Sequence, residues 1–131
     1  MTMLWKGVMP AITTCFDERL HIDHDFMARH CVWLVENGCT GIVACGSLGE
    51  GATLSFEEKL AVFRTCVRAL EGRAPVIAGI SALSTREAVE LARHAADIGC
   101  QGLMVLPPYV YRGDWREMKA HVAAVFRATS L

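Results

Sequence analysis

The residue types best suited to chemistry in this sequence lie in the stretch Gly46-Ser47-Leu48-Gly49-Glu50-Gly51. Glycines on both sides of a short segment let the main chain come close to a ligand, so that amide N–H groups can face a carboxylate. The hydroxyl of Ser47 can donate, accept or relay a proton. The stretch therefore predicts an anion-binding loop. On spacing alone, a plain glycine-rich turn between a strand and a helix remains the alternative.

Two other groups of hydroxyl-bearing residues follow short apolar runs. Thr13 and Thr14 come directly after an apolar run, and Tyr109 and Tyr111 follow the pair Pro107-Pro108. If these runs are parallel strands, the hydroxyls lie at the same edge of the sheet as the Ser47 loop. We therefore expect Thr13 to bind substrate, and Tyr109 is a candidate catalytic residue. Packing of half-buried tyrosines at the rim of a sheet is the alternative for Tyr109 and Tyr111.

Composition and charge narrow the kind of partner. The 131 residues are 53% hydrophobic and carry a formal net charge of −1, with acidic and basic residues spread along the chain. Such a chain can bury a core, but it has no basic stripe for nucleic acid. It also has no apolar stretch of the roughly 18 to 20 residues that a membrane span requires. We expect a small-molecule ligand, no nucleic-acid or membrane partner, and a location in the cytoplasm.

The cysteines and histidines do not have the spacing of a metal site. There is no Cys-x-x-Cys pair and no paired histidine spacing of the kind that holds zinc. We expect the cysteines to be mostly reduced, buried, small apolar residues, and the histidines to be surface or packing residues of helices. The sequence therefore predicts neither a metal nor another cofactor. The residues concerned are Cys15, Cys31, Cys39, Cys45, Cys66 and Cys100, with His21, His24, His30, His94 and His121.

Short apolar runs and helix signals alternate along the chain. Four runs are too short for helices and predict buried strands, at residues 7–16, 41–45, 75–79 and 102–106. Helices are predicted after an Asp23 cap, after capping boxes that begin at Ser55 and Ser84, and after Asp114. Glycines are expected to end the first three helices at positions 38, 72 and 99. The predicted order is βαβαβαβα.

Each predicted helix has a stripe of residues that recur on one face at helical spacing, and the stripe of the third helix is expected to point inward. The four stripes are Phe26, His30, Trp33, Leu34 and Asn37; Phe56, Leu60, Phe63, Val67 and Leu70; Ala88, Leu91, Ala92 and Ala95; and Trp115, Met118, Val122, Val125 and Phe126.

Strict alternation of short buried strands with amphipathic helices predicts a parallel α/β sheet. A Rossmann fold is disfavoured because the first strand leads to Thr13-Thr14-Cys15-Phe16 and not to Gly-x-Gly-x-x-Gly. A full (βα)8 barrel takes about 250 residues. The predicted fold is therefore the N-terminal half of a (βα)8 (TIM) barrel, one half-barrel over residues 1–131 that stops before a fifth strand.

The sequence resembles the dihydrodipicolinate synthase and N-acetylneuraminate lyase family, and the resemblance covers nearly the whole chain. It rests on Gly7-Val8-x-Pro10-Ala11 with Thr13-Thr14-x-Phe16, on Gly46-Ser47-Leu48-Gly49-Glu50 followed by Leu54-Ser55-x-Glu57-Glu58, on Pro75-Val76-Ile77-Ala78-Gly79, and on Pro108-Tyr109. The loop after the second strand is its most specific part. The resemblance implies a (βα)8 barrel that forms a Schiff base between a lysine and a 2-oxo acid.

The same resemblance assigns roles to individual residues and shows two departures. Ser47 takes the hydroxyl role in the loop, with Gly46, Ser47 and Leu48 binding the substrate carboxylate. Leu48 stands where the family has a second hydroxyl, so carboxylate binding would depend more on main-chain amides. Tyr109 matches the first tyrosine of the family's Pro-Tyr-Tyr segment, but Val110 replaces the second, which in the synthases reaches into a neighbouring subunit's site. Glu50 is expected to be a structural hydrogen-bond acceptor in the loop.

The family's Schiff-base lysine lies on the sixth strand and its relay tyrosine on the fifth, and both fall beyond Leu131. Of the three lysines, Lys6, Lys59 and Lys119, we expect none at the carboxyl end of a strand. The resemblance therefore implies a parent class I lyase that acts on pyruvate or a related 2-oxo acid by an aldol-type, dehydratase or deaminase step. This 131-residue chain alone is expected to be inactive, and the parent is expected to be a homo-oligomer.

Two other hypotheses remain open from the sequence. The first is a non-catalytic half-barrel that associates with another copy through its open sheet, because four strands cut from a barrel leave unpaired edges. The second is a different barrel chemistry, such as a phosphate-binding or metal-dependent enzyme. The usual phosphate site of a barrel lies after strands seven and eight, which are not in this sequence.

Overall fold

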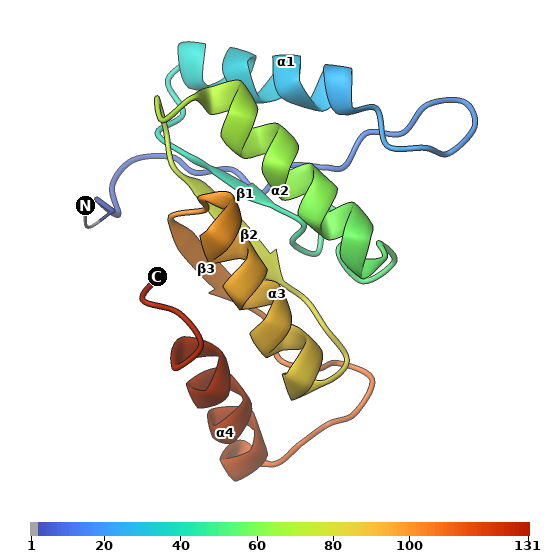
Figure 1. Ribbon diagram of the computed structural model, residues 1–131, viewed down its shortest axis with the longest axis vertical. Coiled ribbons are helices and arrows are strands. Elements are labelled where there is room, and N and C mark those ends of the chain that lie inside the picture. The colour runs from blue at the N-terminus through green and yellow to red at the C-terminus, as the bar shows by residue number, and fades with distance from the viewer. Residues whose placement is uncertain (1–2) are drawn as a thin grey trace.

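A computed structural model describes residues 3–131, so the first two residues of the predicted half-barrel lie outside the described part (Figure 1). Helices and strands alternate along the chain. The helices are α1 (His24–Glu36), α2 (Phe56–Leu70), α3 (Thr85–Ile98) and α4 (Trp115–Phe126), and the strands are β1 (Ile42–Ala44), β2 (Val76–Ile80) and β3 (Gly102–Val105).

The strands form one parallel sheet in the order β1-β2-β3. Val43 pairs with Ile77, and Ala78 pairs with Leu103, so consecutive strands are neighbours. Each crossover lays its helix on the same side of the sheet, and the four helices follow one another in a row from α1 to α4 (Figure 1). The predicted parallel α/β class is confirmed.

The first predicted strand does not form as a regular strand. Of residues 7–16, only Ala11 makes a parallel bridge, to Val43 of β1. The main-chain N–H of Val43 donates to the Pro10 carbonyl at 2.8 Å, and the N–H of Ile12 donates to the Val43 carbonyl at 3.0 Å. Pro10 has no N–H to continue this ladder, and proline is tolerated only at the edge of a sheet. The four-strand prediction is therefore corrected to three strands and an extended segment beside β1.

The predicted helix starts are confirmed at all four helices. The side chains of Asp23, Ser55, Ser84 and Asp114 each accept a hydrogen bond from a main-chain N–H of the first turn. Ser55 and Asp114 form full capping boxes with Glu58 and Glu117, whereas at Ser84 only the hydroxyl half of the predicted box is recorded. Such caps satisfy N–H groups that have no partner within the helix.

The predicted ends of these helices need a smaller correction. Gly99 caps α3 in the left-handed conformation, as predicted. At the ends of α1 and α2, the caps are Asn37 and Glu71, and the predicted glycines, Gly38 and Gly72, come one residue later with positive φ.

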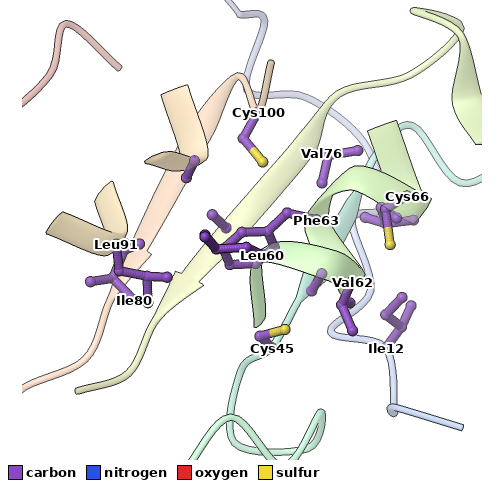
Figure 2. Close-up of a cluster of buried hydrophobic side chains, with 14 of the residues drawn as sticks. Ile12, Cys45, Leu60, Val62, Phe63, Cys66, Val76, Ile80, Leu91 and Cys100 are labelled. Carbon is purple, nitrogen blue, oxygen red and sulfur yellow. The ribbon is translucent and has the colours of Figure 1, made fainter. Parts of the chain in front are cut away.

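The core lies between the sheet and the helices (Figure 2). Phe63 of α2 is fully buried and lies near Leu60 at the centre of the cluster, with Ile80 of β2 and Leu91 of α3 farther along the sheet. On α2 and α3 the predicted stripes largely face this core, because Leu60, Phe63, Leu70 and all four predicted residues of α3 are buried.

The stripes on α1 and α4 lie only partly in the core, through Leu34 and Val125. On α1 the buried residues are Met27 and Cys31, while Phe26 and Trp33 are 45% and 57% exposed. On α4 the buried residues are His121 and Val125, while Trp115, Met118 and Phe126 of the same predicted stripe are exposed. These helices stand at the two ends of the row, so each has a neighbouring helix on one side only (Figure 1). Large apolar residues there do not have to point inward.

Candidate functional site

The glycine-rich loop begins where β1 ends, at the carboxyl edge of the sheet. The Gly46 carbonyl accepts a hydrogen bond from the Gly51 N–H at 3.1 Å, and the Ser47 carbonyl accepts one from the Glu50 N–H at 3.2 Å. Ser47 and Leu48 are exposed, while Gly46 and Gly49 are buried. The loop is therefore a closed turn that presents Ser47 and Leu48 to solvent. This is the edge where parallel barrels place their active sites.

The loop lies directly against the main chain of neighbouring segments. A Cβ atom at Gly79 of β2 would lie 2.5 Å from the Cys45 carbonyl oxygen and 2.7 Å from the Gly46 nitrogen. A Cβ atom at Gly51 would also collide with the Cys45 carbonyl oxygen. Cys45 itself has a positive φ of 58°, which is costly for a residue with a side chain. The missing side chains at Gly51 and Gly79 thus allow the loop to sit tightly on β2.

Gly79→Ala is expected to lower the free energy of unfolding by about 1–3 kcal/mol, because the new methyl group has to displace main-chain atoms. Gly113→Ala is the matched control, since its Cβ would meet only side-chain atoms of Glu117, at 3.1 Å and beyond. Urea unfolding of the two variants and the unchanged protein measures the difference. Equal stability of the two variants would show that the loop does not rest on β2 as described.

Thr14, in the extended segment beside β1, holds the loop in place. Its Oγ1 donates to the Gly49 carbonyl at 2.6 Å, and the threonine is buried. Thr13, the predicted substrate-binding residue, is exposed at the same edge. Thr13 therefore remains a predicted ligand contact, and the neighbouring Thr14 has a positioning role that was not predicted.

Glu50 acts in the loop through its main chain. Its carbonyl accepts hydrogen bonds from the N–H of Thr53 at 2.9 Å and from the hydroxyl of Thr53 at 3.0 Å. Its φ of 55° turns the chain toward α2. Among residues 3–131, no hydrogen bond to its carboxylate is recorded, so the predicted acceptor is the carbonyl and not the side chain.

Lys59 contradicts the expectation that no lysine reaches the carboxyl end of a strand. It lies in the first turn of α2, is 3% exposed, and its Nζ donates to the Ser81 carbonyl at 2.7 Å, just beyond the end of β2. Its charge also pulls down the pKa of the nearby Cys45 thiol, although burial dominates and raises that pKa to about 12. Lys59 therefore ties α2 to the end of β2 from the helix side of the sheet.

Tyr109 and Tyr111 lie in the segment after β3, and both are exposed. The Tyr111 hydroxyl donates to Glu117 Oε1 at 3.3 Å, so this tyrosine is turned toward the start of α4. Ser47 follows β1 and Tyr109 follows β3, and these two strands are two strand spacings apart, about 10 Å, with β2 between them. Ser47 and Tyr109 share the carboxyl edge without a recorded hydrogen bond between them in residues 3–131.

All six cysteines are free thiols, and four of them are buried. Cys31 and Cys66 join α1 to α2, with their Sγ atoms 3.7 Å apart. No group of three or more His, Cys, Asp or Glu side chains that could hold a metal ion occurs within residues 3–131. Over the same residues, no helix combines the length and the apolar character needed to cross a bilayer.

A parallel sheet covered by helices, with a pinned glycine-flanked loop at its carboxyl edge, defines the chain as part of a TIM barrel with its candidate site at the usual end. Comparison with known proteins agrees with this class. The chain belongs to the dihydrodipicolinate synthetase family, whose sequence model matches residues 4–131.

Similar proteins share both the sequence and the fold. The chain is 37% identical over 128 residues to 4-hydroxy-tetrahydrodipicolinate synthase of Agrobacterium fabrum, covering 98% of this chain and 44% of the relative. It superposes on dihydrodipicolinate synthase from Aquifex aeolicus with a TM-score of 0.92 at 33% identity, covering 97% of this chain and 43% of that one.

A third similar protein is the Acinetobacter baumannii dihydrodipicolinate synthase, whose crystal structure is complexed with pyruvate. Its TM-score is 0.91 at 34% identity, and the match covers 95% of this chain and 43% of that one. The chain therefore spans less than half the length of the relatives that it matches.

Proposed function

We propose that this chain supplies the carboxylate-binding part of the active site of a class I lyase that forms a lysine Schiff base with pyruvate or a related 2-oxo acid. The observation that carries the proposal is the Gly46 to Gly51 loop, which is exposed at Ser47 and Leu48 and held by Thr14 and β2. A loop fixed in this way needs little reorganisation when it binds an anion. The pyruvate complex of the Acinetobacter baumannii relative supports this substrate class.

The chain's own residues divide the work at this edge. The amides of Ser47 and Leu48 bind the carboxylate, and the Ser47 hydroxyl holds or passes a proton near the reacting carbonyl. Leu48 adds no hydroxyl, so the main-chain amides carry more of the binding. Thr13 contributes a hydroxyl from the first segment, and Tyr109 contributes one from the segment after β3. We propose a catalytic role for Tyr109 because it matches the first tyrosine of the family's Pro-Tyr-Tyr segment and lies at the carboxyl edge of the sheet.

The nucleophile has to come from outside this chain. An amine attacks a carbonyl only when it is free of a proton and aimed at the carbon. Lys59 donates to the Ser81 carbonyl from the helix side, Lys6 is exposed before the first segment, and Lys119 is exposed on the outer helix α4. Within residues 3–131, none of the three has a recorded hydrogen bond to the Ser47 loop. Leu48 and Val110 differ from the family pattern, so the second substrate stays open. The reaction that follows imine formation is an aldol-type, dehydratase or deaminase step.

Incubation with pyruvate and borohydride, followed by mass spectrometry, tests this division. The imine forms from an amine and the pyruvate carbonyl with loss of water, and borohydride reduces it to a stable adduct. The 131-residue chain is expected to gain no adduct. A protein that continues this chain through the fifth and sixth strands is expected to gain one adduct, and a Ser47→Ala variant of it should form less adduct at low pyruvate concentration.

Two outcomes would contradict the proposal. An adduct on Lys59 of the 131-residue chain would mean that the nucleophile lies within it. A complete protein without any adduct would refute the imine mechanism.

A further inference from the structure

Two buried cysteines face each other where α1 packs against α2 (Figure 1). Cys31 lies in the middle of α1 and Cys66 in the second half of α2, and neither side chain is exposed. Their Sγ atoms are 3.7 Å apart and share a hydrogen bond, although the two residues are 35 positions apart in the sequence. The sulfur atoms of a disulfide are about 2.05 Å apart, so a bond between them requires a further approach of about 1.7 Å.

The other buried cysteines differ from this pair. Among the cysteines of residues 3–131, only Cys31 and Cys66 have a recorded hydrogen bond between their sulfur atoms. Cys45 follows β1 and Cys100 precedes β3, and burial raises the pKa of each to about 12. A thiol that keeps its proton reacts poorly, because the thiolate is the nucleophile. We therefore expect Cys45 and Cys100 to stay reduced where the pair reacts.

The hydrogen bond between the two thiols makes one of them easier to ionise. A thiolate at Cys31 accepts a hydrogen bond from the Cys66 thiol, and this bond outweighs burial and holds the pKa of Cys31 below its ordinary value of 9.0. The same bond, together with burial, raises the pKa of Cys66. Cys31 is therefore the nucleophile of the pair, and Cys66 keeps its proton beside it.

A surface groove brings a small oxidant close to the pair. The groove has a volume of about 310 Å³ and is lined from both helices, by Ala28 and Val32 of α1 and by Ala69 of α2 among others. Ala28 lies three residues before Cys31, and Ala69 lies three residues after Cys66. Residues three apart are neighbours on a helix surface, so the groove lies next to both cysteines. A slight local opening between the helices then admits a molecule as small as hydrogen peroxide.

We propose that Cys31 and Cys66 form an oxidation site, at which a hydroperoxide converts the two thiols into a disulfide that joins α1 to α2. With hydrogen peroxide, the Cys31 sulfur attacks one oxygen, the O–O bond breaks, and a sulfenic acid and water form. The Cys66 sulfur then attacks the sulfenic sulfur, and the hydroxyl group leaves as a second water. The two thiols lose two electrons and two protons, and the peroxide takes up both.

The disulfide closes a segment of the chain that contains the candidate site. β1 and the Gly46 to Gly51 loop both lie between the two cysteines in the sequence. A cross-link restricts the unfolded chain more than the folded chain, so it stabilises the fold. For a segment of this length, the midpoint of urea unfolding is expected to rise by about 1–2 M. The site is independent of the proposed lyase activity, because it requires neither pyruvate nor a residue of the Ser47 loop.

Peptide mapping tests the site directly. The protein is treated with hydrogen peroxide, its remaining thiols are blocked in urea, and it is cleaved after arginine, lysine and glutamate. Cys31 is then the only cysteine of peptide 30–36, and Cys66 is the only cysteine of peptide 65–68. We expect these two peptides to be joined, with a mass lower than the sum of the two thiol peptides by two hydrogen atoms. Dithiothreitol should separate them again.

Two results of the mapping would overturn the proposal. One is a treated protein in which Cys31 and Cys66 are blocked as free thiols or carry separate sulfinic acids. The other is a disulfide from Cys31 to one of the partly exposed cysteines, Cys15 or Cys39, in place of Cys66.

Cys31→Ala and Cys39→Ala form a matched pair of variants, because Cys39 lies in the same closed segment but has no recorded contact with Cys66. Peroxide should raise the urea midpoint of the unchanged protein and of Cys39→Ala, and it should leave that of Cys31→Ala where it was. If circular dichroism shows that Cys31→Ala does not fold, Cys66→Ala replaces it. An equal rise in Cys31→Ala, or no rise in the unchanged protein, would contradict the proposal.

Discussion

Phe63→Ala is expected to lower the free energy of unfolding by about 3–5 kcal/mol. Phe63 is fully buried at the centre of the cluster between α2 and the sheet (Figure 2). Two effects add to this loss of stability. The free energy gained by moving the ring's apolar surface out of water is lost, and the alanine leaves a cavity in the core. Because small domains are only marginally stable, this loss is a large part of the total. Urea unfolding followed by circular dichroism measures it.

Phe56→Ala is the matched control on the same helix. Phe56 is only partly buried and contacts the edge of His94, with ring centroids 5.7 Å apart, so its removal should cost clearly less. If Phe63→Ala is unfolded throughout, Phe63→Leu, with an expected loss of about 1–2 kcal/mol, replaces it. Equal losses at positions 56 and 63 would contradict the described core.

Raising the pH above 9 is expected to destabilise the protein strongly. Burial raises the pKa of Cys45 and of Cys100 to about 12, against an ordinary value of 9.0 for the unfolded chain. A raised pKa means that the folded state keeps its proton where the unfolded state loses it. The stabilising contribution is therefore complete below pH 9 and is lost between pH 9 and about pH 12. Each thiol contributes a slope of up to about 1.4 kcal/mol per pH unit.

The double variant Cys45→Ala/Cys100→Ala isolates this contribution from the other groups that titrate at high pH. Its free energy of unfolding should fall less steeply than that of the unchanged protein between pH 9 and pH 11, even if it starts lower. Urea unfolding at intervals of one pH unit gives both slopes. Identical slopes would mean that these two thiols are not shielded from water in the folded protein.

Local signals predicted most of the elements of this fold. Ser55 with Glu58 marks the start of α2, and Asp114 marks the start of α4, because a capping side chain leaves a direct trace in the sequence. The prediction of a regular first strand was wrong. The apolar run of residues 7–16 correctly indicated an extended main chain, but it did not show how many hydrogen-bonded pairs this segment would make with β1. With Pro10 in it and β1 on one side only, it makes a single bridge.

The faces of α1 and α4 could not be read from hydrophobicity. The helical pattern groups large apolar residues on one face, and it included Trp33 and Trp115 in these stripes. Both are exposed, because α1 and α4 end the row of helices and have an open side. Met27 and Cys31, which do face the core, have the same four-residue spacing as Phe26 and His30, and each lies one residue after them in the sequence. Only the place of each helix in the sheet decides between such adjacent stripes.

The sequence predicted the loop of the candidate site, but not the contacts with neighbouring segments that hold this loop in place. The glycines around Ser47 indicated a close main-chain approach, which the contacts at Gly79 and Gly51 describe in detail. The roles of Thr14 and Lys59 were missed because they depend on contacts across 35 and 22 residues. One local signal for Lys59 was present: it lies four residues after the Ser55 cap, and the start of such a helix lies near the strand ends.

The central claim is that the main-chain amides of the Ser47 loop bind the carboxylate of a 2-oxo acid. Nuclear magnetic resonance of the ¹⁵N-labelled chain, titrated with pyruvate and separately with acetone, tests it most directly. Acetone keeps the ketone and lacks the carboxylate. We predict saturable shifts of the amide signals of Ser47, Leu48 and Gly49 with pyruvate and none with acetone. Equal responses to both compounds, or pyruvate shifts confined to residues away from the carboxyl edge of the sheet, would contradict the account.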